Sequence, residues 1–99
     1  MPNDQQHLTK QDYAHKLAYR LRRLRTNRGL TQEQVAERAG IAPNTYQRYE
    51  QGVSKDGKPT NPRLNSLVSL ASVFEIDAGD LIRVDYDALD PLDPEQGTE

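Results

Sequence analysis

Cysteine is absent from this sequence of 99 residues, which excludes a disulfide scaffold, a thiolate metal site and a cysteine nucleophile. A long hydrophobic run is also missing. The first 12 residues are polar throughout, so we predict no signal peptide. The most apolar stretch, residues 64–76, is interrupted by Asn and Ser and is too short to span a bilayer. We therefore expect one small domain in the cytoplasm, without a membrane partner.

Positive charge is nearly absent from the last third of the chain. Residues 64–99 hold one base, Arg83, against 9 acids, whereas residues 1–63 hold 12 bases against 6 acids. The net charge of −2 therefore hides a basic part, at +6, followed by an acidic part, at −8. Such asymmetry indicates either a polyanion-binding face beside an acidic tail, or solvated helix faces followed by a disordered end.

The apolar residues recur at helical spacing, and no alternation with a period of two is sustained. Ala14, Leu17, Ala18, Leu21 and Leu24 form the stripe of a first helix, which Asn27-Arg28-Gly29 ends. A capping-box pattern at Thr31 and Gln34 begins a second helix over 31–38. Similar arguments predict helices over 43–51, 64–74 and a short one after Asp77. The fold class is therefore predicted to be all-α, with five short helices.

Composition divides the chain into three parts. We predict a disordered or frayed N-terminal arm over residues 1–12 and a helical domain over 13–83. Residues 84–99 are predicted to form an acidic, disordered tail, because acids alternate there with two Asp-Pro steps.

Only Ala39-Gly40-Ile41 joins the second and third predicted helices. So short a joint with a glycine favours a sharp crossing over an antiparallel hairpin, as in a helix-turn-helix unit. Such a unit places its second helix in the major groove of DNA. The exposed side of helix 43–51 carries groups that can bond base edges: Asn44, Thr45, Gln47, Arg48 and Gln51.

The stretch LRRLRTNRGLTQEQVAERAGIAPNTYQRYEQG, followed by LVSLASVFEIDAGDLI, resembles the Cro/cI-type (Xre) helix-turn-helix family of phage and bacterial repressors. The likeness covers about two thirds of the chain, and the motif itself falls at about 32–51. It implies a phage-repressor-like domain of five helices that binds double-stranded DNA as a homodimer and regulates transcription as a repressor. No cofactor is expected.

The resemblance also implies roles for single residues. Gln32 matches a glutamine that contacts a phosphate and supports the recognition helix, the alternative being a plain helix former. Arg25 and Glu50 match a buried ion pair that ties the first helix to the third. The DNA-binding candidates on the recognition helix, for which plain solvation is the alternative at Gln47 and Arg48, are Pro43, Asn44, Thr45, Gln47 and Arg48.

For other aromatic and basic side chains, a contact with DNA competes with a structural or solvated role. Tyr46 and Tyr49 are three residues apart, which favours the core over a stacking platform for bases. The basic residues of the first helix are either solvated or able to reach flanking phosphates, the candidates being Arg20, Arg23 and Arg28.

Two features depart from the family's pattern. Ala42 stands where a Ser or Thr usually caps the recognition helix, and Pro43 follows it. Either a DNA phosphate supplies part of this cap, or Asn44 becomes the N-cap with Gln47 at N3 and the helix starts two residues later. The loop over 53–62 is also long; it either brings Lys55 and Lys58 to the DNA backbone or is a tolerated insertion.

No enzyme is predicted. His7 and His15 have neither a metal spacing nor a paired carboxylate, and no phosphate-loop or dinucleotide fingerprint is present. Two rivals to a regulator of transcription stay open: an antitoxin that represses its own operon, and a protein-interaction module that has lost DNA binding. The acidic tail could compete with DNA, bind a protein partner, or simply aid solubility.

Overall fold

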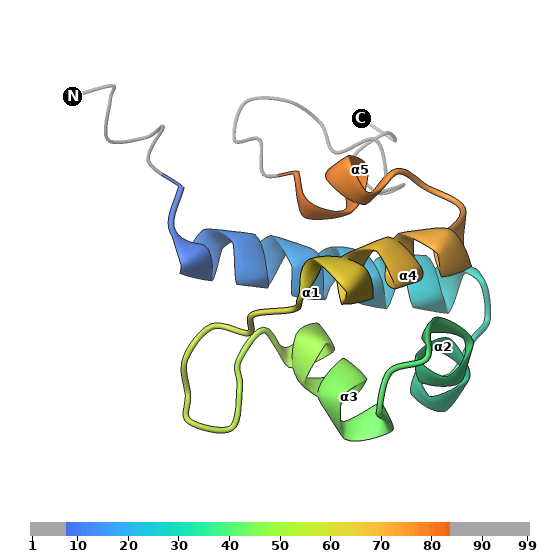
Figure 1. Ribbon diagram of the computed structural model, residues 1–99, viewed down its shortest axis with the longest axis horizontal. Coiled ribbons are helices and arrows are strands. Elements are labelled where there is room, and N and C mark those ends of the chain that lie inside the picture. Colours follow the sequence, from blue (N-terminus) through green and yellow to red (C-terminus); the bar gives the residue numbers. More distant parts are fainter. Residues whose placement is uncertain (1–7, 84–99) are drawn as a thin grey trace.

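Five α-helices form the part of the chain that this computed structural model describes, residues 8–83 (Figure 1). They are α1 (Lys10–Asn27), α2 (Gln32–Ala39), α3 (Pro43–Gln51), α4 (Leu64–Phe74) and α5 (Ala78–Ile82). No strand occurs over residues 8–83, where one isolated antiparallel bridge joins Val53 to Pro59. The predicted all-α class is confirmed. The predicted tail and most of the predicted arm lie outside the described residues.

α1 begins earlier than the sequence led us to expect. The Thr9 hydroxyl accepts a hydrogen bond from the Asp12 amide, and the Asp12 carboxylate accepts one from the Thr9 amide. This capping box satisfies two amide groups that a helix start otherwise leaves unpaired. Residues 10–12, which we assigned to a frayed arm, are therefore helical.

The core lies where the apolar stripes of all five helices meet. α1 packs against α3 and α5, while α4 packs against α2 and α5. Burying each large apolar side chain stabilises the fold by about 1.5–3 kcal/mol. The buried residues shared by this core include Leu17, Leu21, Leu24, Val35, Tyr46, Tyr49, Leu70, Phe74 and Leu81.

The joint between α2 and α3 turns the chain sharply. Gly40 ends α2 with a left-handed φ of 70°, which costs glycine little. The Ile41 amide then donates to the Ala36 carbonyl over 2.8 Å, and this closes the turn. Figure 1 shows α2 and α3 crossing instead of lying antiparallel, as the three-residue joint predicted.

Arg20 of α1 and Arg28, the C-cap residue of α1, donate hydrogen bonds to backbone carbonyls near the ends of other helices. Arg20 is only 2% exposed, and its Nη1 donates to the carbonyls of Asp80 and Leu81 at 2.9 and 2.8 Å. Arg28 donates from Nη2 to the Phe74 carbonyl at the end of α4 and lies over the Phe74 ring. Both predicted alternatives for Arg20, solvation and a phosphate contact, are wrong, because this buried side chain caps the end of α5. Arg28 caps the end of α4 but is exposed, and its phosphate contact stays a prediction.

Candidate nucleic-acid interface

α3 has one polar face directed to solvent and one face directed to the core. Asn44, Gln47 and Gln51 are exposed, as is Pro43 at the helix start. Thr45 and Arg48 are half-buried at the edge of this face. Over the described residues no neighbouring element covers the outer face of α3. The side-chain amide groups of Asn44, Gln47 and Gln51 are therefore available to a partner.

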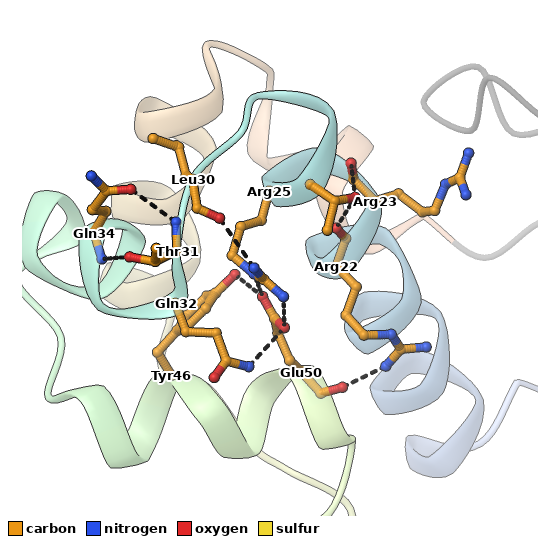
Figure 2. Close-up of polar contacts among 10 residues, drawn as sticks. Arg22, Arg23, Arg25, Leu30, Thr31, Gln32, Gln34, Tyr46 and Glu50 are labelled. Carbon is orange, nitrogen blue, oxygen red and sulfur yellow. Dashed lines mark hydrogen bonds and ion pairs between the residues drawn. The ribbon is translucent and has the colours of Figure 1, made fainter.

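The inner face of α3 is held by the carboxylate of Glu50, which is 3% exposed (Figure 2). Arg25 of α1 donates to it from Nε at 2.6 Å and from Nη2 at 3.0 Å. Gln32 of α2 donates from Nε2 at 3.0 Å, and the Tyr46 hydroxyl donates to the second oxygen. The predicted Arg25–Glu50 ion pair is therefore present, and it is one part of a larger network.

This network joins three helices at a single carboxylate. Arg25 also donates from Nη1 to the Leu30 carbonyl before α2, and Arg22 donates to the backbone carbonyl of Glu50. Because charge-assisted hydrogen bonds are stronger than neutral ones, the network fixes how α3 sits on α1 and α2. The orientation of the outer face follows from these buried contacts.

The contacts of this network shift the pKa values of Glu50 and Tyr46. Burial alone would raise the pKa of Glu50, but hydrogen bonds from Arg25, Tyr46 and Gln32 outweigh it and lower that pKa. Burial and the hydrogen bond to Glu50 raise the pKa of Tyr46. Glu50 is therefore ionised and Tyr46 neutral at pH 7, the states in which their hydrogen bond forms.

The lowered pKa of Glu50 makes stability depend on pH on the acid side. Unfolding returns the carboxyl to its usual pKa of 4.5, so the contribution of the network is fully present above that pH. It is lost as the pH falls through the lower pKa of the folded state. We expect the free energy of unfolding in urea to fall more below about pH 4.5 in the wild type than in Glu50→Gln. Parallel curves for the two proteins would contradict this assignment.

The first turn of α3 has no side-chain cap. Its N-cap is Ala42 and Pro43 is its first residue, so the alternative in which Asn44 caps a later start is wrong. Pro43 has no amide hydrogen to satisfy. The backbone N–H of Tyr46 donates to the Ala42 carbonyl. The backbone N–H groups of Asn44 and Thr45, which precede it, point along the helix axis toward the start of α3.

The long loop after α3 folds back on itself as a hydrogen-bonded hairpin over residues 53–59. The Ser54 amide donates to the Lys58 carbonyl at 2.7 Å, and Gly57 turns the chain with a φ of 82°. The Asp56 carboxylate accepts from the Ser54 hydroxyl and from the Lys58 amide, and these bonds lower its pKa. Figure 1 shows this loop beside α3. Its conformation is therefore defined by its own residues.

The structure brings some predicted contact residues together and separates others. Lys58, Thr45 and Arg48 line one cavity between α3 and the loop. Lys55 is exposed in the same loop but is not part of that lining. Gln32 is half-buried with its amide on Glu50, which places it between the protein network and the surface.

Sequence reasoning missed three contributors to this site. The role of Tyr46 as a donor to Glu50 could have been found from their spacing of four residues on one helix. The partners of Arg22 and Arg20 could not have been found in this way, because they lie 28 and 61 residues away in the sequence.

The described residues contain neither a metal-binding cluster nor a membrane-spanning helix. Residues 8–83 hold no group of three or more His, Asp or Glu side chains placed to bind a metal ion. Within the same residues, none of the helices combines the length and the apolar character that crossing a membrane requires.

Comparison with known proteins agrees with this geometry. The family described as "Helix-turn-helix domain" matches residues 16–83. The chain is 33% identical over 63 residues to the cryptic phage CTXphi transcriptional repressor RstR of Vibrio cholerae, a match over 64% of this chain and 51% of that protein. It is 42% identical over 57 residues to the uncharacterised HTH-type transcriptional regulator YobD of Bacillus subtilis (strain 168), over 58% of this chain and 46% of that protein. The chain thus spans about half the length of these curated relatives. No solved structure matches it significantly.

Proposed function

The chain belongs to the helix-turn-helix domain family, and from that membership we propose that it is a sequence-specific DNA-binding regulator of transcription that reads the major groove with α3. The observation that carries this proposal is the outer face of α3. Asn44 and Gln47 project from it into solvent, while the Glu50 network holds the opposite face. Asn and Gln side chains can bond adenine with both amide atoms, and Arg48 can bond guanine in the same way.

The remaining candidates fit contacts to the DNA backbone. Lys55 and Lys58 carry positive charge on the loop beside α3, where they would neutralise phosphates and make affinity sensitive to salt. The backbone N–H groups of Asn44 and Thr45, at the uncapped start of α3, can donate hydrogen bonds to a phosphate oxygen. The side-chain amide nitrogen of Gln32 donates one hydrogen to Glu50, and its second hydrogen would bond a phosphate of the same strand. Phosphate contacts set the position of the protein, and base contacts set the sequence it prefers.

We extend the proposal to assembly and to the direction of regulation. A homodimer would present two α3 helices to half-sites about 34 Å apart on one side of the duplex. The relative from Vibrio cholerae is named a repressor, and repression by occupying a promoter needs no surface beyond the DNA-binding one. The proposal therefore assigns neither a catalytic activity nor a cofactor to this chain.

Selection of bound sites from random duplex DNA tests the proposal. We expect one enriched motif made of two inverted half-sites spaced by about one helical turn. The matched control is the triple variant Asn44→Ala, Gln47→Ala and Arg48→Ala, whose helix content should stay unchanged because these side chains lie outside the core. That variant should enrich no motif. Failure of the wild type to enrich any sequence would refute the proposal.

A further inference from the structure

A cavity of about 780 Å³ lies between the start of α1, α3 and the loop that follows it. Apolar side chains from four helices line part of it, among them Tyr13, Tyr49, Leu67 and Ile82. Tyr13 is 40% exposed, although it is a large aromatic residue. An apolar lining open to solvent favours an occupant with apolar groups of its own.

The rest of the lining is basic. Lys10, Arg48 and Lys58 come from three different elements and face the same space. The acid in the lining, Asp56, already accepts hydrogen bonds from Ser54 and from the Lys58 amide. An occupant that carries carboxylates would therefore be attracted to this cavity by charge as well as by apolar contact.

The lining residue Thr60 carries a buried hydroxyl. Thr60 is 9% exposed, and its hydroxyl Oγ1 forms no hydrogen bond with the described part of the chain. A buried hydroxyl without a partner destabilises the fold.

The acidic tail, residues 84–99, has the composition that this cavity fits. It holds six acids and no base among its 16 residues, and its apolar residues Tyr86, Leu89 and Leu92 stand between the acids. It follows Arg83, the residue next to Ile82 in the cavity lining. Sixteen residues can span about 50 Å when extended, so length does not limit its reach.

We propose that the acidic tail docks in this cavity, with its apolar residues against Tyr13 and Leu67 and its carboxylates on Lys10, Arg48 and Lys58. A docked tail covers Thr45 and Arg48, and so competes with DNA for the edge of α3. This competition rests on the proposed DNA-binding function, whereas the docking itself does not. Because the tail is tethered, its effective concentration at the cavity is of millimolar order.

Amide chemical shifts of the full-length protein without DNA test the docking. The variant keeps every residue of the tail in place but replaces its six acids by amides: Asp85→Asn, Asp87→Asn, Asp90→Asn, Asp93→Asn, Glu95→Gln and Glu99→Gln. We expect the amides of Tyr13 and Thr60 to shift between wild type and variant at any protein concentration. The matched control, Glu33→Gln with Glu37→Gln on the exposed side of α2, should leave both amides unmoved.

Three results would overturn the docking. Unchanged amides at Tyr13 and Thr60 would mean that the cavity holds no tail. Changes confined to Lys16 and Arg23 would place the tail on another face of α1. Changes that disappear on dilution would assign the cavity to the tail of a second copy.

DNA affinity measured on the selected site tests the competition. A tail docked about nine-tenths of the time lowers affinity about tenfold, so the amide variant should bind about tenfold more tightly than the wild type. Equal affinities would refute the competition even if the amide shifts support docking. If neither protein binds any DNA, the proposed function fails, and the amide shifts alone decide whether the tail occupies the cavity.

Discussion

Replacing Glu50 by alanine is expected to lower the free energy of unfolding by about 3–5 kcal/mol. The substitution removes the carboxylate that accepts four hydrogen bonds from three side chains, and it leaves the Arg25 guanidinium, 18% exposed, without its counter-charge. It also leaves the buried Tyr46 hydroxyl without its acceptor. The expected loss of stability is large for a protein of this size, because the total free energy of unfolding is typically about 5–15 kcal/mol.

Urea denaturation followed by far-UV circular dichroism measures this change. The matched control is Glu37→Ala, an exposed acid on α2, which should alter stability by no more than about 0.5 kcal/mol. The double variant Arg25→Met with Glu50→Met should be less destabilised than the sum of its single variants, because it leaves no unpaired charge at this site. A loss below about 1 kcal/mol for Glu50→Ala would show that the network behaves as an exposed ion pair does.

The helices and the turn were largely predictable from local patterns. Spacing of apolar residues located all five helices, and Ala39-Gly40-Ile41 predicted the sharp joint that Gly40 makes. The start of α1 was missed because its capping box uses Asp12 at the third helical position, where the usual pattern has Glu or Gln. Local sequence thus located the elements, with an error of three residues at the start of α1 and of one residue at each end of α2, predicted over 31–38 and observed over Gln32–Ala39.

Contacts between distant residues were predictable only where a family pattern supplied them. The Arg25–Glu50 pair came from the resemblance, but the hydrogen bonds of Arg20 did not, since a charged residue between leucines is ordinarily assigned to solvent. Its position three residues after Leu17 and four before Leu24 does place it on the buried stripe. That spacing was the one available signal that Arg20 faces inward.

The cavity beside α3 could not have been inferred from sequence at all. Its lining combines the first turns of α1 with α3, the loop and residues near the end of α5, and no local pattern reports how these segments approach one another. The loop itself was predicted from composition, but the bonds of Ser54 and Asp56 that shape it depend on side-chain geometry. The DNA-contact assignments of Gln47 and Arg48 stay predictions.

Replacing Arg48 by alanine is expected to weaken binding to the selected site by about 1–3 kcal/mol, or roughly 5- to 150-fold in Kd, if its guanidinium bonds both acceptors of a guanine. Arg48 is half-buried at the edge of the outer face of α3, so the side chain can extend along a base edge. Binding to scrambled DNA should fall far less, because a lost base contact lowers specificity while phosphate contacts persist.

Paired titrations on selected and scrambled duplexes at several salt concentrations separate the two kinds of contact. Lys55→Ala is the matched control: it should weaken binding to both duplexes equally and reduce the slope of log Kd against log salt by about one. An Arg48→Ala protein that weakens equally on both duplexes, with the same change of slope, would make Arg48 a phosphate ligand. In that case Asn44 and Gln47, the exposed amides of the same face, would have to carry the discrimination between bases.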